Sequence, residues 1–459
     1  MAVAAVSLDT GIPRFVALAT GSSVAAGQGG VNQGIAALLL FATDLALLSA
    51  NNGFVLISAA LVLMMTPALA LFYSGFVRSR NVLNTMVMSF TAMALVSVLW
   101  VLFGYSLAFS SGSGPLAPFI GGWQWVGLSN WSAPYGDSQL SQGAVALFQA
   151  SFAIITPALI SGAVVERMDF RAWVLFLLLW STFIYLPLAH MVWGPGGFLG
   201  ADGLGAIDFA GGLVVEIPSG VAAAVAALVV GRRRSVSAGH AAPPHNVPFI
   251  LMGAGLLWFG WFGFNGGSGL VAGNLASLAC LTTNTAGAAA ALGWMLIETW
   301  QRGKPTAVGV ATGAVAGLVA ITPAAGFVSP LAAMLIGFAA ALVCYQALQL
   351  KNRWRLDDSL DVLPVHGVAG LLGTLLTGVF TLRSLNPAGA DGLLLGQAGQ
   401  FWIQCKAAGF TILFVGVGTY VVLQLIRLVL PLRVNDIEET QGLDINAHGE
   451  EAYNSEFTG

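Results

Sequence analysis

Apolar segments of about 20 residues recur along most of this chain, and they limit its possible folds more than any other feature. A helix needs about 20 largely apolar residues to cross the hydrocarbon core of a bilayer. We count eleven such segments between short polar breaks, at residues 53–76, 82–109, 143–165, 172–192, 209–230, 248–268, 277–300, 306–325, 331–350, 362–382 and 398–430. The sequence therefore predicts an all-α polytopic membrane protein with eleven transmembrane helices.

Composition excludes an ordinary soluble protein. Hydrophobic residues make up 57% of the chain and charged residues only 8%, whereas a soluble domain has roughly a quarter of its residues charged. The formal net charge of −3 says little about partners. Cys280, Cys344 and Cys405 lie in apolar runs without the paired spacing of a zinc site or a disulfide framework. We expect no metal, no cofactor and no structural disulfide.

Basic residues predict the orientation of the spans, because Lys and Arg accumulate in cytoplasmic loops. Fourteen of the 17 fall at every second break: Arg78, Arg80, Arg167, Arg171, Arg232, Arg233, Arg234, Arg302, Lys304, Lys351, Arg353, Arg355, Arg427 and Arg433. Only Arg383 clearly departs from the pattern. We therefore expect the amino terminus outside and the carboxyl terminus inside. The arginines at 232–234 are interpreted as a topology anchor rather than as a lipid or nucleic-acid site.

The arrangement of the spans indicates an internal repeat. Five spans precede the loop at 232–245 and five follow it before the eleventh. An odd number of spans in each half gives the halves opposite topology, so we expect an inverted 5+5 repeat with a pseudo-two-fold axis. Many secondary transporters bind their substrates at the interface between such repeats.

Two ionisable residues lie inside these apolar segments. Glu216 falls in the fifth span of the first half and His366 in the fifth span of the second. An ionisable side chain at that depth is costly and marks a candidate pathway. The inverted repeat predicts that Glu216 and His366 face one another near the midplane. The alternative is a buried polar pair that only fixes the register of two helices.

The ends of the chain differ from its centre. Residues 1–50 are expected to form an extension outside the membrane that lies on its surface, although the weak apolar run at 15–25 leaves a cleaved signal peptide open. Residues 34–50 are apolar but contain Asp44 and are short for a span. Residues 51–432 form the predicted membrane domain. Residues 433–459 are polar and acidic and form the predicted cytoplasmic tail.

Six short strings, in order along the chain, resemble one known family. They are ALFYSG at 70–75, FQASFAIIT at 148–156, HMVWG at 190–194, DFAGG at 208–212, GWFGFNGGS at 260–268 and GLDINAHGE at 442–450. These strings are similar to those of the Amt/Mep/Rh ammonium transporters, and the resemblance covers residues 52–453. It implies a homotrimer in the plasma (inner) membrane in which each subunit encloses its own narrow pore for ammonium or ammonia.

The resemblance also implies an external substrate site. Phe152, Trp193 and Ser268 match the residues that bind the ion at the mouth of the pore. A small cation gains cation–π attraction from aromatic faces, and a hydroxyl oxygen accepts one of its hydrogen bonds. Asp208 matches the aspartate that shapes this mouth, where a carboxylate before a helix accepts backbone amide hydrogen bonds. From composition alone, Trp193 is equally explained as a residue of the aromatic belt at the membrane interface.

Below the mouth, the resemblance implies a gate of stacked rings from Phe148, Phe152 and Phe264. A hydrated cation cannot cross such a plug without losing most of its hydration. Ammonium differs from potassium because it can release a proton and cross as neutral ammonia. Taken singly, each Phe is also explained by ordinary packing.

At one position the sequence departs from the common family pattern. Most members have two histidines along the pore, whereas this chain has Glu216 in place of the first and keeps His366 as the second. A similar acidic replacement occurs in some fungal members. The pair has two states of equal net charge, either Glu⁻ with His⁺ or both groups neutral. We expect the two groups to titrate as a unit and to relay a proton.

These observations favour an electrogenic ammonium transporter that recruits NH4+, deprotonates it and conducts NH3 while the pair relays the proton. One alternative is a passive Rh-like channel for NH3 or CO2, and another is an ammonium sensor that signals through the tail. No nucleophile–base pair or phosphate-binding loop indicates an enzyme. The string at 442–453 resembles the tail segment that docks under neighbouring subunits, and the resemblance implies a possible PII-type regulatory partner at this face.

Overall fold

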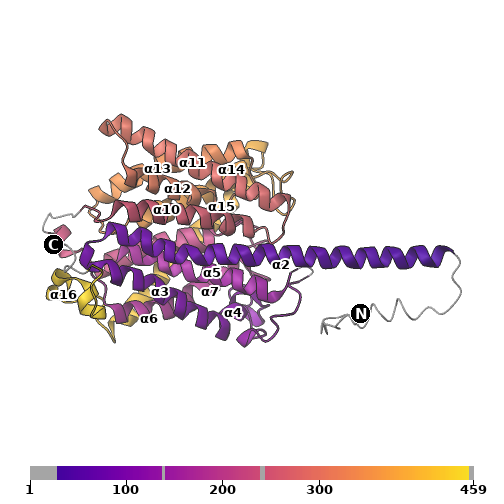
Figure 1. The fold of residues 1–459 in the computed structure, drawn as a ribbon, viewed down its shortest axis with the longest axis horizontal. Helices are drawn as coiled ribbons and strands as arrows, with labels where there is room; N and C mark the ends of the chain where they lie inside the picture. Colours follow the sequence, from indigo (N-terminus) through magenta and orange to yellow (C-terminus); the bar gives the residue numbers. More distant parts are fainter. Residues whose placement is uncertain (1–27, 137–139, 238–242, 454–459) are drawn as a thin grey trace, which may run out of the picture.

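The described part of the chain folds almost entirely into helices. In a computed structural model, the described residues are 28–136, 140–237 and 243–453, and they contain helices but no β-strand. The long helices pack side by side with their axes roughly aligned, and the chain's C-terminal segment lies at one end of the bundle (Figure 1). The prediction of an all-α membrane protein is confirmed.

Several of the long helices are interrupted by π-helical turns. In chain order, the helices and turns are α2 Gln28–Phe76, α3 Val82–Leu99, η2 Trp100–Gly104, α4 Tyr105–Phe109, α5 Gln142–Ile160, α6 Phe170–Trp180, η6 Ser181–Tyr185, α7 Leu186–Trp193, η7 Gly212–Glu216, α8 Ile217–Val230, α10 Val247–Trp261, η8 Phe262–Gly266, α11 Asn274–Arg302, α12 Ala307–Ile321, α13 Pro330–Arg353, η9 Leu363–Val368, α14 Ala369–Phe380 and α15 Ala398–Arg427. The shorter helices are α9 Arg234–Ser237, α16 Asp436–Gln441 and the π-helical turn η11 Asp444–His448.

Ten of the predicted spans correspond to helices that are long and apolar enough to cross a membrane among the described residues. The predicted span at 306–325 is the exception, because α12 has only 15 residues, or about 22 Å at 1.5 Å per residue. Pro323 follows Thr322 and has no backbone N–H, so it cannot continue the helical hydrogen-bond pattern. Nearly all of α12 is buried, because α11 and α13 pack against it and cover it.

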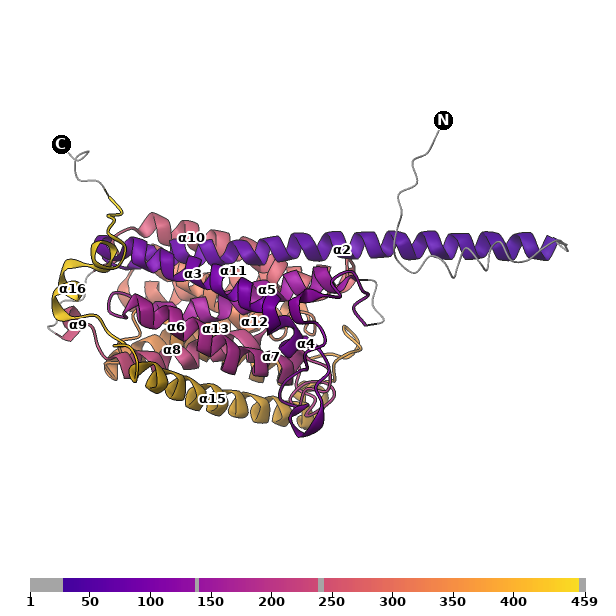
Figure 2. The ribbon, with the colours of Figure 1, turned by 90° about the horizontal axis from the view of Figure 1, so that it is seen from below.

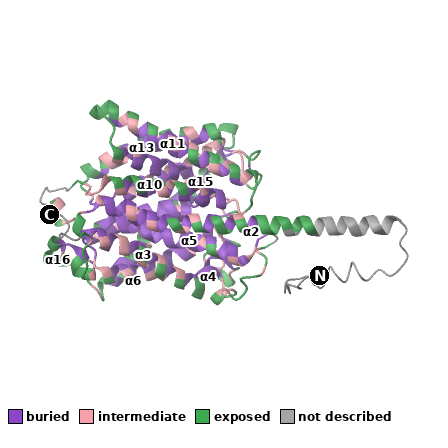
Figure 3. Cartoon of the chain, in the orientation of Figure 1, coloured by how far each residue is buried: buried purple, intermediate pink, exposed green. Residues whose placement is uncertain are grey.

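The extension at residues 1–50 stays a predicted segment on the membrane surface, and the possible signal peptide at 15–25 lies outside the described residues. Helix α2 runs without a break for 49 residues and projects far beyond the other helices (Figures 1 and 2). The described residues of this projecting part are exposed (Figure 3). The polar pair before Gly53 does not end the helix, because its side chains bond to loops: Asn51 accepts from the backbone of Ala272, and Asn52 accepts from Ser141.

Helix α5 occupies the centre of the bundle. In its most apolar window 83% of the residues are buried, more than in any other candidate span. It contacts α2, α3 and α8, and it carries Phe148 and Phe152. Both phenylalanines therefore face the protein interior.

Helices α8 and α14 run in opposite directions, and each is preceded by a π-helical turn whose backbone amides bind an aspartate. Glu216 lies in the π-helical turn η7 before α8, and His366 lies in η9 before α14. Asp208, eight residues before Glu216, accepts backbone hydrogen bonds from the first residues of η7. Asp358, eight residues before His366, does the same for η9. This likeness supports the inverted repeat.

The C-terminal segment folds back onto the end of the bundle where α2 ends (Figure 2). Asp444 accepts from the backbone of Asn84 at 2.8 Å, and Asn81 accepts from the backbone of Leu443 at 2.8 Å. Arg433 pairs with Glu439 at 2.6 Å. These contacts join the segment to its own chain, whereas the predicted docking under a neighbouring subunit stays a prediction.

Candidate functional site

Four aromatic side chains from three parts of the chain form one continuous cluster. Phe152 lies at its centre, with ring centroids 4.8 Å from Phe148, 4.3 Å from Phe264 and 6.0 Å from Trp193. Phe148, Phe152 and Phe264 are almost fully buried. The structure thus brings together the three residues of the predicted gate, and it places Trp193 edge-on against them.

Trp193 lies at the outer edge of this cluster, where it is held from two sides. It is the last residue of α7 and is only partly buried. Its indole Nε1 donates to the backbone carbonyl of Asp208 at 3.0 Å. The Asp208 carboxylate accepts three backbone amide bonds, from Gly211, Gly212 and Leu213, at 2.6 to 2.9 Å. Asp208 therefore fixes the start of η7 with its side chain and the Trp193 ring with its backbone.

Ser268 lies at the end of the helix that carries Phe264. Its hydroxyl donates to the backbone carbonyl of Phe264 at 2.8 Å, and the residue is partly exposed. Because the hydroxyl proton is engaged in this bond, the Ser268 oxygen presents its lone pairs as acceptors. The structure therefore places Ser268 beside the aromatic cluster as a hydrogen-bond acceptor.

Glu216 and His366 form a direct pair in the protein interior. The Glu216 Oε2 atom and the His366 Nδ1 atom are 2.7 Å apart, and the side chains are 1% and 6% exposed. Close contact of the backbones permits this approach, because a Cβ on Gly220 would lie 2.1 Å from the backbone nitrogen of Gly367. Small residues allow such close crossings in membrane proteins. The predicted juxtaposition is present in the structure.

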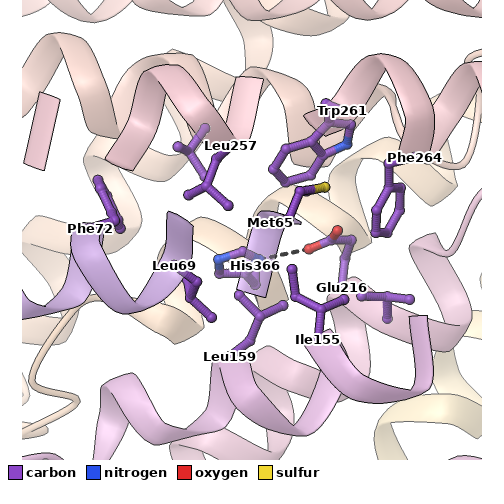
Figure 4. Close-up of a pocket in the computed structure, with 12 residues that line it drawn as sticks. Met65, Leu69, Phe72, Ile155, Leu159, Glu216, Leu257, Trp261, Phe264 and His366 are labelled. Atoms are coloured by element: carbon purple, nitrogen blue, oxygen red, sulfur yellow. Dashed lines mark hydrogen bonds and ion pairs between the residues drawn. The ribbon is translucent and has the colours of Figure 1, made fainter. Parts of the chain in front are cut away.

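The pair lines a narrow cavity, which we call the pore cavity (Figure 4). The other lining side chains are apolar or aromatic: Met65, Leu69, Phe72, Ile155, Leu159, Val215, Leu257, Trp261, Phe264 and Val315. The Trp261 indole donates to Thr322 rather than into the cavity. Among the lining residues, only Glu216 and His366 thus offer a proton acceptor.

A second narrow cavity continues from the pore cavity toward the end of α2. His366 and Phe72 line both cavities, and Tyr73, Phe76, Thr312, Leu360, Asp361 and Val365 complete the second. His366 therefore stands between two chambers, with its Nδ1 atom bound to Glu216. Phe264 links the pore cavity to the aromatic cluster at the opposite end.

Several lining residues were not identified from the sequence. Met65, Leu69 and Ile155 carry no signal, because an apolar residue in an apolar helix is indistinguishable from packing. Asp361 is different, since an acidic residue five positions before His366 in the chain could have been noted as a candidate. Trp261 lies within one of the family-like strings but has no charge to mark its role.

The fold and the site together define a class of protein: a polytopic membrane protein with an aromatic cluster, an apolar cavity and a buried acid–imidazole pair in a row. Comparison with known proteins gives the family. The model of the Ammonium Transporter Family matches residues 53–453, and this chain belongs to that family.

Individual relatives agree over nearly their whole length. The chain is 48% identical over 403 residues to the "Ammonium transporter" of Bacillus subtilis, covering 87% of this chain and 97% of the relative. It is 40% identical to "Ammonium transporter Amt1" of Archaeoglobus fulgidus, covering 88% and 99%.

Solved structures of the same fold are also similar. The crystal structure of Saccharomyces cerevisiae Mep2 has a TM-score of 0.78 at 35% identity, covering 85% of this chain and 88% of that chain. A structure described as "Sensor Amt Protein" has a TM-score of 0.80 at 27% identity, covering 88% and 99%.

Proposed function

We propose that this protein moves ammonium across the membrane as ammonia and a separately relayed proton. NH4+ binds at Trp193, Phe152 and Ser268, loses its proton, and crosses the pore cavity as NH3. The Glu216–His366 pair carries the proton past the same barrier, so that net charge moves. The observation that carries this proposal is the single acid–imidazole pair in an otherwise apolar cavity.

The apolar walls support selection by acid–base chemistry rather than by size. A potassium ion in the pore cavity would lose its hydration and find no ring of oxygen ligands. Ammonia is uncharged and small, and its desolvation costs far less. The released proton, in contrast, has a hydrogen-bonded path from Glu216 to His366. An ion without a dissociable proton cannot cross as a neutral molecule and a separate proton.

The surroundings of the pore are also proposals. We place the C-terminal end in the cytoplasm of the plasma (inner) membrane, because basic residues gather at that end of the bundle. We propose a homotrimer, because the family to which the chain belongs implies one. Native mass spectrometry should then give three times the 47.4 kDa of one chain. A PII-type regulatory protein is the proposed partner at the cytoplasmic end.

A sensor role is the second candidate, favoured by the likeness to a structure described as "Sensor Amt Protein". A sensor binds ammonium without sustained flux, whereas the proposed transporter binds ammonium and also gives sustained flux with current. An Rh-like gas channel gives flux without current.

Current measurements on reconstituted liposomes separate the three. We expect a sustained current when ammonium is added and none when potassium replaces it. Flux without current would favour the gas channel, and binding without either would favour the sensor.

A further inference from the structure

Asp361 lines the second cavity and also pairs with a buried lysine, Lys351. Its Oδ1 atom pairs with the Nζ atom of Lys351 at 2.5 Å, and Lys351 also donates to the backbone carbonyl of Asp358 at 2.8 Å. The Lys351 side chain is 8% exposed, and that of Asp361 is 28% exposed. In the described chain no hydrogen bond reaches the other carboxylate oxygen, Oδ2. One acceptor of Asp361 is therefore occupied and one is free.

The walls of the second cavity offer acceptors to a small cation. Tyr73 and Thr312 both donate their hydroxyl protons to backbone carbonyls, of Leu159 and Val308, so their oxygens keep only lone pairs to offer. Phe72 and Phe76 add aromatic rings 5.2 Å apart. An ammonium ion donates four hydrogen bonds and is attracted to ring faces. A carboxylate, two hydroxyl oxygens and two rings match that chemistry.

Asp361 is held in this position by its backbone. Its φ of +60° lies in the left-handed region, which Asp and Asn adopt more readily than most residues. The residue precedes η9, whose amide groups are bound by Asp358. Strain at such a residue is commonly found at functional sites. The head group of Lys351 is itself an alkylammonium, and its bond to Asp361 shows that this carboxylate binds an ammonium donor.

We propose that Asp361 forms a second ammonium site in the cavity beyond His366, and that Lys351 weakens this site so that the ion leaves. This inference rests on the proposed function, because ammonia that has crossed the pore cavity regains its proton at this end. Lys351 shares the carboxylate charge and leaves only part of it for the product ion. Asp361 is a binding residue, and Lys351 is a positioning residue that acts through it.

Two variants and one control test the site in the full-length protein. Lys351→Met removes the competing cation, Lys351→Arg keeps it, and Asp361→Asn removes the carboxylate while tolerating the same backbone conformation. Crystals of each are soaked in thallium(I), a monovalent cation with anomalous scattering. We expect an anomalous peak beside Asp361 in Lys351→Met that is weaker in Lys351→Arg and missing in Asp361→Asn. A second cavity without thallium in Lys351→Met overturns the proposal.

Transport gives an independent readout. In liposomes preloaded with ammonium on the C-terminal side, this product ammonium should inhibit transport by Lys351→Met at a concentration up to about fivefold lower than for the wild type. A factor of this size corresponds to the loss of a partly exposed ion pair. Lys351→Arg should be inhibited at the same ammonium concentration as the wild type. Asp361→Asn should need a higher ammonium concentration for the same inhibition. Equal inhibition in all four proteins counts against the site. If the wild type carries no ammonium, the proposed function fails, while the thallium experiment still decides whether the site exists.

Discussion

The proposed function assigns recognition of ammonium to single residues of the aromatic cluster, and Trp193 is the clearest case. It contacts Phe152 and is fixed by a bond to Asp208. We predict that Trp193→Leu weakens apparent ammonium affinity by about 2- to 30-fold, which corresponds to a cation–π contribution of about 0.5–2 kcal/mol. Trp402→Leu is the control, because this Trp is 60% exposed on α15 and outside the cluster. Equal effects from both would make Trp193 an interface-belt residue.

The proposed function assigns the pH response of transport to the Glu216–His366 pair. We predict that Glu216→His shifts the pH dependence of transport while leaving the assembled protein intact. A carboxyl group with an ordinary pKa of about 4.3 is then replaced by an imidazole with one of about 6.5, so two bases of similar strength share the proton. Currents measured across a pH series test this. A superimposable pH profile would show that the residue at 216 does not set the response.

The sequence predicted these residues better than it predicted their surroundings. Glu216 and His366 were identified because charge in an apolar helix is expensive, and the repeat placed them together. Gate residues such as Phe152 needed the family resemblance, because a Phe in a membrane helix has no distinguishing property. Asp361 was missed for a related reason, since it lies in a polar break where acids are common.

At the level of elements, the crossing of α8 and η9 holds the pair together. A Cβ on Gly220 would lie 2.1 Å from the backbone nitrogen of Gly367, and rigid backbone cannot yield by that amount. We predict that Gly220→Ala separates Glu216 from His366 and abolishes transport or assembly. Gly255→Ala on α10 is the matched control, because a Cβ there meets nothing within 4 Å. Normal current in Gly220→Ala would contradict the close crossing.

A buried ion network braces the C-terminal end of the same elements. Glu166 pairs with Arg78 at 2.9 Å and with Arg233 at 2.7 Å, and Arg233 pairs with Asp357 at 2.8 Å. Asp357 precedes the residue that caps η9. The network thus joins α2, the end of α5 and the entry to α14.

Glu166→Gln is expected to lower stability by roughly 3–5 kcal/mol, because the arginines lose a buried partner. Burial opposes ionisation of Glu166, but Arg233 and Arg78 outweigh it and lower its pKa below 4.5. A carboxyl group with a lowered pKa contributes stability above its ordinary pKa, and this contribution is lost as pH falls through the folded value. The thermal unfolding temperatures of wild type and variant, measured in detergent, should therefore become more similar as pH falls from 7 to 3. A constant difference would contradict this role.

The boundaries of the elements followed from hydropathy with two exceptions. Helix α12 is shorter than its apolar segment, because neighbouring helices rather than lipid surround it. Helix α2 is longer, because contacts from distant loops satisfy Asn51 and Asn52. Both depend on tertiary contacts. The π-helical turns under Glu216 and His366 have no signature in the sequence.

For the whole molecule, the fold arranges four features in one line: the aromatic cluster, the pore cavity, the acid–imidazole pair and the second cavity. In the proposed function, neutral ammonia and the proton cross the same barrier separately. This proposal requires that charge movement depends on Glu216 and that passage of ammonia does not.

The most direct test measures current and ammonia entry in the same liposomes, the latter from a pH dye in the lumen. The wild type should give both, with potassium giving neither. Glu216→Gln should keep the dye response to ammonia entry and lose most of the current, because the amide cannot take up the proton. An unchanged ratio of current to ammonia entry in Glu216→Gln would contradict the separate proton path.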